Sequence, residues 1–305
     1  MSGLPEAVVQ MQIAANGDAG RAWLAALPRL IDELCERWSI TDIGPAYEGG
    51  CVAYVAPVAL ANGAHAVLKL CLLDDETERE ADALALWEGN GAVQLLKCDR
   101  SRGAMLLECV EPGTSLAQHP DRDDAIRIAC SLLRRLWIEA PASHPFRLVT
   151  DFAQRCADTF PVRHIESGHT LFAERTLART VALCREFANV HGPRVIANRD
   201  FHLGNVLASQ REPWLAIDPK PLAGEPAFDA AHLVRSLLGK SISTPELERL
   251  ISTIAGLLEL PAQRVAGWIL VRSMEDAFWC VDTGAGDPQW DVACVEAVER
   301  SCHLL

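Results

Sequence analysis

The sequence lacks the features that place a protein in a membrane or send it out of the cell. Its 305 residues contain no apolar run of about 18 residues, the length that a helix needs to span a bilayer. No Lys or Arg precedes Arg21, so the charged segment that opens a secretory signal is missing as well. These absences predict a cytoplasmic protein with no membrane partner.

Basic residues are also scarce. The chain has 28 Lys and Arg against 41 Asp and Glu, which gives a net charge of -13. Nucleic-acid binding needs a basic face to neutralise phosphates, so nucleic acid is excluded as a partner. With 50% hydrophobic and 23% charged residues, the chain is typical of a globular protein with one large domain or two lobes. An acidic surface suits a cationic small molecule, although such surfaces are common.

The eleven cysteines contain no CxxC pair and no His/Cys zinc spacing. Several lie inside apolar runs, such as Cys71 in LKLCLL and Cys109 in MLLECV. Cysteines in such positions are typical of reduced thiols in the core of a cytosolic protein. The sequence therefore predicts no disulfide framework.

The first part of the chain predicts one helix followed by β-hairpins. Apolar residues recur at helical spacing over residues 20–38. Two β-rich runs, 47–60 and 65–73, surround an Asn-Gly turn, which is a strong hairpin signal. Residues 74–88 predict a helix with an acidic first turn. A second hairpin follows over residues 92–110.

After the Pro-Gly break in EPGTSL, helical patterns dominate. The sequence thus predicts an α+β fold with two lobes: a β-rich N-terminal lobe over residues 1–110 and a mainly helical C-terminal lobe over residues 111–305. No internal repeat or low-complexity tract is present.

The segment VIANRDFHLGNVLASQREPWLAID carries the first candidate site. Short strands at 206–208 and 214–217 predict a hairpin that brings Asn205 beside Asp218. One carboxylate and one amide oxygen suit Mg²⁺, and Asp200 in the preceding loop would face the same place. This arrangement matches a kinase catalytic loop, in which Asp receives the hydroxyl proton and Asn holds a metal. Alternatively, all three are ordinary turn residues.

A kinase also needs a lysine for the nucleotide. Lys69 lies on the second strand of the first hairpin, and Glu80 or Glu76 on the following helix can pair with its buried charge. The alternative is a strand lysine that reaches solvent. Further candidates for nucleotide contact act through the backbone: Gly49 and Gly50 beside phosphates, and the Glu108 carbonyl with the Val110 N–H at the adenine edge.

The segment NRDFHLGNVLASQREPWLAIDPKPLAGEPAFD resembles the catalytic segment of the streptomycin 6-kinase and hydroxyurea branch of the aminoglycoside phosphotransferases. The likeness continues through HAVLKL, EREADALALW, MLLE and EPGTSL and covers most of the chain. It implies a protein-kinase-like bilobal fold and transfer of phosphate from ATP, with Mg²⁺, to a small-molecule hydroxyl. By position, Asp200 resembles the catalytic base, Asn205 and Asp218 the magnesium ligands, and Lys69 with Glu80 the phosphate lysine and its partner.

One residue departs from the family pattern. Asn198 stands where the family usually has His, two residues before the base; its amide offers both a donor and an acceptor, so the loop is expected to survive. His202 matches the family's DxHxGN pattern and is expected to be a buried loop histidine with satisfied nitrogens. Asp229 is expected to cap a helix beginning near Ala230 and to brace the loop.

The acceptor site is the least constrained. Residues 274–291 hold five carboxylates and no Lys or Arg, and Glu275, Trp279 and Asp282 would share a helix face that could cradle a cationic sugar. Alternatively, the face is solvated, with Arg272 pairing Asp276. The sequence leaves three functions open: a kinase for a streptomycin-like acceptor, a kinase for another metabolite or antibiotic, and a nucleotide-binding pseudo-kinase. The acceptor hydroxyl, the preference for ATP or GTP and the oligomeric state stay undetermined.

Overall fold

The structure of the protein is a computed structural model. Its described residues are 4–48, 53–74, 77–189, 194–284 and 286–301. The candidate phosphate-contacting glycines, Gly49 and Gly50, lie outside the described residues.

The chain forms two compact units. The first comprises Met1–Gly113 and Ser209–Arg211, and the second comprises Thr114–Ala208 and Glu212–Leu305. The short piece Ser209–Arg211 is the turn of a hairpin whose strands otherwise belong to the second unit.

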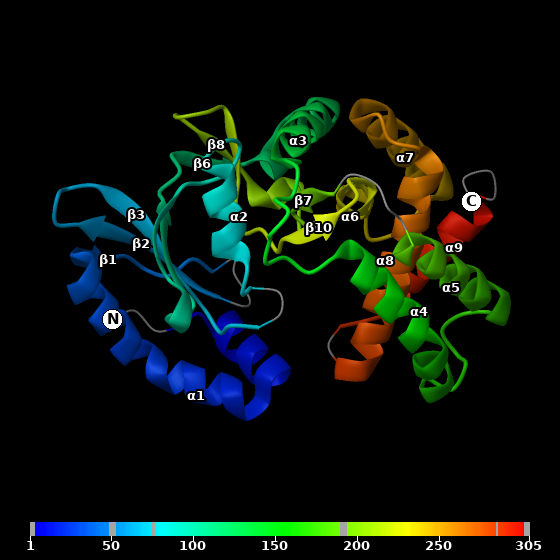
Figure 1. Cartoon of the computed structure of the whole chain (residues 1–305), viewed down its shortest axis with the longest axis horizontal. Coiled ribbons are helices and arrows are strands. Elements are labelled where there is room, and N and C mark those ends of the chain that lie inside the picture. The colour runs from blue at the N-terminus through cyan, green and yellow to red at the C-terminus, as the bar shows by residue number, and fades with distance from the viewer. Residues whose placement is uncertain (1–3, 49–52, 75–76, 190–193, 285, 302–305) are drawn as a thin grey trace. The chain divides into compact units, whose positions relative to one another are not determined.

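The first unit is built on a five-stranded sheet with the order β1-β2-β3-β5-β4 (Figure 1). All neighbouring strands in it are antiparallel. The predicted hairpin around Asn62-Gly63 is confirmed as β2 and β3, with Ala59 opposite His65. The strands are β1 (Ile40–Ile43), β2 (Ala53–Leu60), β3 (His65–Cys71), β4 (Leu95–Asp99) and β5 (Ala104–Glu108), with a 3₁₀ turn η1 (Arg100–Arg102) between the last two.

The long helix α1 (Glu6–Trp38) supplies one wall of the core of this unit. Its apolar residues are spaced three or four apart, so they lie on one face and pack against β-strand side chains. The buried cluster consists of Leu27, Ile31, Leu34 and Trp38 of α1 with Ile40, Tyr54, Ala56, Val58, Ala66, Leu68, Leu70, Ala104 and Leu106.

The predicted helix over residues 74–88 is wrong at its start. The helix α2 spans only Glu80–Trp87. Local side-chain bonds hold the preceding segment as a turn: the Asp74 carboxylate accepts the Thr77 N–H at 2.8 Å, and the Thr77 hydroxyl donates to the Leu72 carbonyl at 3.1 Å. Such bonds compete with helix formation and delay its start.

The second unit is mainly helical. Its short strands β7 (Val195–Ala197) and β10 (Leu222–Gly224) pair antiparallel, and β8 (Val206–Ser209) and β9 (Trp214–Ala216) form the predicted hairpin beside β6 (Pro112–Ser115). The helical segments are η2 (Leu116–Gln118), α3 (Arg122–Leu136), α4 (Val149–Glu166), α5 (Glu174–Ala188), η3 (Leu203–Asn205), α6 (Ala227–Leu237), α7 (Thr244–Leu258), α8 (Ala262–Thr283) and α9 (Gln289–Arg300).

Trp268 of α8 lies at the centre of the helical core. It is fully buried, and its ring contacts Phe152 of α4, Phe187 of α5 and Phe228 of α6 at centroid distances of 4.6–6.4 Å. Its indole N–H donates to Glu225 at 2.7 Å, so the polar atom of the ring is also satisfied. Aromatic packing therefore fixes α6, whose first turns support the candidate site.

The cysteines of the described segments are all free thiols, as predicted. Cys71, Cys130, Cys156, Cys184 and Cys294 are buried. Burial raises the pKa of the Cys130 and Cys184 thiols to about 12, which keeps them protonated and unreactive. Within the described ranges, no helix is both long enough and apolar enough to cross a membrane.

Candidate active site

The loop between β7 and β8 is anchored by Asp229. The Asp229 carboxylate is fully buried and accepts the backbone N–H groups of Asn198 at 2.8 Å and Arg199 at 2.7 Å. It also accepts the Trp137 indole N–H at 3.0 Å. The predicted bracing role is confirmed. The predicted capping role is wrong, because α6 begins at Ala227 and Asp229 lies inside its first turn.

Asn198 occupies the position where the family usually has His. Its side chain is 1% exposed, and its Oδ1 accepts the N–H of Asp200 at 3.1 Å. Its Nδ2 has no hydrogen-bond partner among the described residues. The Asn amide thus holds the loop through its oxygen, and the buried donor that it leaves unpaired is the cost of the substitution.

Asp200 is held by two cationic or polar side chains of the second unit. Its Oδ2 lies 3.1 Å from Lys220 Nζ, and its Oδ1 lies 3.2 Å from His232 Nε2. Burial opposes ionisation of this carboxyl. The hydrogen bond from His232 and the charge of Lys220 outweigh burial and hold the pKa of Asp200 well below its usual range. Asp200 is therefore a fixed carboxylate at neutral pH.

Arg272 determines the tautomer of His232. An Arg272 guanidinium nitrogen lies 3.0 Å from His232 Nδ1. A guanidinium can only donate, so Nδ1 accepts and the ring proton lies on Nε2, which faces Asp200. The pKa of His232 is lowered to about 4, mainly by burial and next by the positive charge of Arg272. The neutral ring is thus oriented to donate to the carboxylate.

This half-buried, neutral histidine is expected to make the stability depend on pH. In the unfolded chain the His232 ring takes up a proton near pH 6.5, whereas in the folded protein it does so only near pH 4. The free energy of unfolding is expected to fall by about 3 kcal/mol as the pH drops through this window. His232→Gln keeps a donor but cannot titrate, so urea unfolding should show a shallower slope between pH 6.5 and 4. His65→Gln, at an exposed strand position, should keep the wild-type slope.

Asn205 and Asp218 meet at the open end of the β8–β9 hairpin. The Ile217 N–H donates to the Asn205 carbonyl at 2.9 Å, so the residue next to Asp218 is bonded directly to Asn205. The Asn205 Nδ2 donates to the Asp200 carbonyl at 3.2 Å, which leaves its Oδ1 as the side-chain atom for a metal. Amide and carboxylate oxygens are the ligands that Mg²⁺ prefers, so the donor set fits this ion.

Two residues of this region, Arg199 and Asp218, have a strained backbone conformation. Arg199 has φ = 67° and Asp218 has φ = 52°, a left-handed conformation that non-glycine residues rarely adopt. Strain of this kind persists where surrounding contacts impose it, and it gathers at active sites. At Arg199, Asp229 and Arg272 impose the strained conformation, since they bind the N–H and the carbonyl of this residue.

In the first unit, Lys69 and Glu80 form a buried ion pair. Lys69 Nζ lies 2.7 Å from both carboxylate oxygens of Glu80, and the two side chains are 6% and 2% exposed. The predicted pairing is present, and the alternative of a lysine that reaches solvent is wrong. The pair comes from adjacent elements, since Lys69 lies on β3 and Glu80 begins α2.

The end of β5 is braced by an arginine that the sequence did not suggest. Arg211 donates to both oxygens of Glu108 at 2.8 and 2.9 Å, and to the carbonyls of Gly89 and Ala92. The side chain of Glu108 is therefore fully engaged, and the contact of its backbone carbonyl with a nucleotide stays a prediction. Val110 follows β5 and is half-buried.

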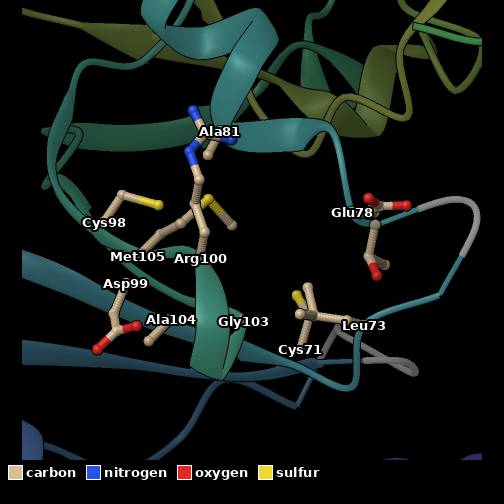
Figure 2. Close-up of a pocket in the computed structure, with 11 residues that line it drawn as sticks. Cys71, Leu73, Glu78, Ala81, Cys98, Asp99, Arg100, Gly103, Ala104 and Met105 are labelled. Atoms are coloured by element: carbon tan, nitrogen blue, oxygen red, sulfur yellow. The ribbon is translucent and has the colours of Figure 1, made fainter. Parts of the chain in front are cut away.

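A small pocket of the first unit is too small for a nucleotide. Figure 2 shows it between β3, β5 and the segment leading to α2, where Cys71, Leu73 and Met105 line its wall. Its volume is about 20 Å³, which is room for about one water molecule.

A larger pocket adjoins the catalytic loop in the second unit. Its volume of about 500 Å³ lies in the range of small-molecule sites, about 300–1,000 Å³. His202 and Gly204 of the loop, His119, Arg122 and Ser236 supply its polar lining. The expectation that His202 is buried is wrong, because the residue is half-buried; its Nδ1 accepts the Gly204 N–H at 3.0 Å, which bonds one of the two ring nitrogens within the loop.

The predicted acidic face of α8 is neutralised by arginines of α4. Glu275 accepts from Arg155 at 3.0 Å and from Arg163 at 2.6 Å, and Arg163 also pairs with Asp282 at 2.7 Å. Trp279 on the same helix is 45% exposed. A cationic ligand would have to displace these arginines to reach Glu275. Its role in substrate binding stays a prediction.

The alternative pairing predicted within α8 is wrong. Asp276 pairs with Arg235 of α6 at 2.7 Å, and Arg235 also pairs with Asp291 of α9. Arg272 instead bonds His232 and the loop carbonyl of Arg199. Arg272 and Asp276 are one helical turn apart in sequence, but tertiary contacts from α6 decide both partners.

Sequence comparison places the chain among antibiotic kinases. A family model described as aminoglycoside/hydroxyurea antibiotic resistance kinase matches residues 37–284. Streptomycin 6-kinase of Streptomyces glaucescens is 35% identical over 286 residues, 92% of each chain. Hydroxyurea phosphotransferase of Kitasatospora aureofaciens is 35% identical over 309 residues, 97% of this chain and 85% of that protein.

Structural comparison agrees on the fold. A crystal structure of an aminoglycoside phosphotransferase APH(4)-Ia variant with ADP and hygromycin B aligns with a TM-score of 0.63. It is 16% identical, and the alignment covers 88% of this chain and 97% of that chain. The predicted α+β, protein-kinase-like fold is confirmed.

Proposed function

Because the chain belongs to the family of aminoglycoside/hydroxyurea antibiotic resistance kinases, we propose that it transfers the γ-phosphate of ATP to a hydroxyl of a streptomycin-like aminoglycoside in the cytoplasm. Membership confirms the resemblance read from the catalytic segment. It makes the protein an ATP-dependent small-molecule phosphotransferase of the antibiotic-resistance type.

The proposal depends on one observation, that Lys220 and His232 hold the Asp200 carboxylate between them. A carboxylate fixed by Lys220 and His232 stays ionised and aligned, so it can orient the acceptor hydroxyl and take its proton as transfer proceeds. Phosphoryl transfer has a loose transition state, so this positioning matters more than a strongly basic group.

The predicted nucleotide contacts complete the proposal. Lys69, held straight by Glu80, would bind the phosphates of ATP, with the backbone of Gly49 and Gly50 beside them. The Glu108 carbonyl and the Val110 N–H would bind adenine. Asn205 and Asp218 would hold Mg²⁺, which when bound neutralises charge on the phosphates.

The acceptor is proposed to enter the pocket of about 500 Å³ beside His202 and Gly204. This pocket lies next to the loop that carries Asp200, and α6 lines it with Ser236 one turn after His232. The face formed by Glu275, Trp279 and Asp282 is retained as a second contact for a cationic sugar.

Hydroxyurea is the second candidate acceptor. The hydroxyurea phosphotransferase is as similar to this chain as the streptomycin 6-kinase, at 35% identity each. A pseudo-kinase is disfavoured, because Asn198 still fixes the loop and the positions of Lys69, Asp200, Asn205 and Asp218 are all kept.

An enzyme-coupled assay that measures ADP release tests the function directly. We expect Mg²⁺-ATP turnover to be stimulated by streptomycin, and stimulation by hydroxyurea instead would select the second acceptor. Tight ATP binding without stimulation by either compound would contradict both acceptors. An absence of ATP binding would contradict the kinase assignment itself.

A further inference from the structure

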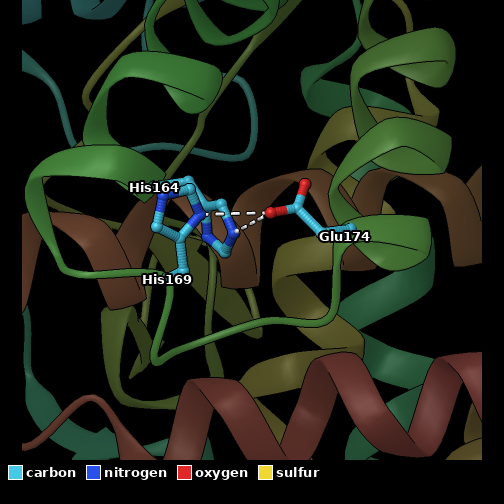
Figure 3. Close-up of side chains that lie close together, drawn as sticks. All are labelled: His164, His169 and Glu174. Carbon is cyan, nitrogen blue, oxygen red and sulfur yellow. Dashed lines mark hydrogen bonds and ion pairs between the residues drawn. The ribbon is translucent and has the colours of Figure 1, made fainter.

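Two histidines and a glutamate converge where α4 passes into α5. His164 lies in the last turn of α4, His169 in the connection, and Glu174 is the first residue of α5 (Figure 3). Their ligand atoms all lie within 4.8 Å of one another. Glu174 Oε1 lies 3.3 Å from His164 Nε2 and 3.1 Å from His169 Nδ1.

His164 supports a ligand at this cluster independently, because its ring is buried without a hydrogen bond to any described residue. Its side chain is 1% exposed, yet neither ring nitrogen has a hydrogen-bond partner among the described residues. The 3.3 Å approach to Glu174 is therefore close but not aligned as a hydrogen bond. Buried polar groups are normally bonded, so an imidazole that faces a carboxylate without bonding it needs another partner.

The connection is built to hold His169 in place. His169 has φ = 60°, and its N–H donates to the His164 carbonyl at 3.0 Å. The Ser167 hydroxyl donates to the same carbonyl at 2.9 Å, and the Thr170 hydroxyl donates to Ser167 at 2.8 Å. The backbone thus turns back on α4 and brings the second ring against the first, with centroids 4.7 Å apart.

From this geometry we propose that His164, His169 and Glu174 bind Zn²⁺. Zinc bonds of about 2.0–2.1 Å at a tetrahedral angle put neighbouring ligand atoms about 3.3 Å apart. The two nitrogen–oxygen distances of 3.3 and 3.1 Å match this spacing. The His169 Nδ1–Glu174 contact is a hydrogen bond, which the ion would replace. The His164–Glu174 contact is not aligned as one, so the His164 lone pair is available to the ion. Water completes the fourth position.

The site joins two antiparallel helices at a solvent-facing edge. Glu174 is 74% exposed and His169 is 52% exposed, so the ion can enter without opening the core. The net charge of -13 favours a cation. Arg163, next to His164, pairs with Glu275 and Asp282 of α8. An ion bound to His164 would therefore also hold the end of α4 that carries Arg163.

Zinc titration by calorimetry tests the proposal on the full chain, purified without a polyhistidine tag and without nucleotide. We expect one saturable Zn²⁺ per chain. His169→Gln and Glu174→Gln change exposed side chains and should fold normally, yet each should weaken binding at least about tenfold. The matched exposed changes His65→Gln and Glu166→Gln should leave the affinity unchanged.

Asp218→Asn separates this site from the proposed magnesium site. It should still bind one Zn²⁺, because Asp218 is not part of the cluster. The proposal is overturned if the wild-type chain shows no saturable binding, if both ligand variants bind as tightly as wild type, or if Asp218→Asn abolishes binding. Since the readout is ion binding, kinase inactivity alone would not affect the result.

Discussion

Asp200→Asn is expected to lower acceptor-stimulated ATP turnover by about 10²–10⁴-fold, the range for loss of a positioned proton acceptor. The amide keeps the size of the carboxylate and one acceptor oxygen, which can take the hydrogen bond of Lys220 or of His232. The loop should hold its shape, because Asp229 still binds two of its backbone N–H groups. What it loses is the negative charge that takes the hydroxyl proton. ATP affinity should stay close to wild type, because Asp200 is not assigned to the nucleotide.

The measurement is steady-state turnover with saturating acceptor, together with ATP binding by calorimetry. Asp158→Asn, an exposed carboxylate on α4, is the matched control and should turn over as wild type does. If Asp200→Asn kept more than about a tenth of the wild-type turnover, the base assignment would be wrong. If it lost ATP binding as well, the change would have damaged the loop rather than the chemistry.

Local patterns were sufficient to predict most of the fold. The β2–β3 hairpin follows from an Asn-Gly turn between alternating runs, and α1 follows from apolar spacing, because both signals lie within one short stretch of chain. The start of α2 could not be predicted in the same way. It depends on whether Asp74 and Thr77 bond each other or continue a helix, and these local bonds compete directly with helix formation.

The candidate site was predictable where its residues are close in sequence. Asn205 and Asp218 come together because a hairpin joins them, and Lys69 meets Glu80 because one strand leads into one helix. His232 was missed as the partner of Asp200, and Arg272 as the partner of His232, since both lie on helices far along the chain. Lys220 carried a signal, two residues after Asp218, but only the fold shows that it turns back to Asp200.

Charge counting did not show the partners of the α8 carboxylates, for the same reason. Residues 274–291 contain no basic residue, so the segment looked like a cradle for a cation. The neutralising Arg155 and Arg163 lie on α4, more than a hundred residues earlier. A local excess of carboxylates therefore predicts a cation site only when no other element brings guanidinium groups to it.

Lys69→Met is expected to cost about 3–5 kcal/mol in the free energy of unfolding, because it leaves the Glu80 carboxylate buried without its lysine. Turnover should also fall, by about 10²–10³-fold, since a preorganised positive charge at the phosphates is lost. Urea unfolding and turnover at saturating ATP measure the two effects. Lys97→Met, an exposed lysine on β4 of the same sheet, should shift stability by no more than about 0.5 kcal/mol.

The double variant Lys69→Met/Glu80→Leu separates the two roles of the pair. Two apolar side chains in place of a buried ion pair of similar volume should restore most of the lost stability. They restore no charge, so turnover should stay as low as in Lys69→Met. Recovery of both properties would mean that Lys69 acts only through folding, and the phosphate assignment would be wrong. Recovery of neither would mean that the space around β3 and α2 cannot accept the apolar pair. Recovery of stability alone would mean that the Lys69 ammonium binds the nucleotide and that the Glu80 carboxylate holds the ammonium in place.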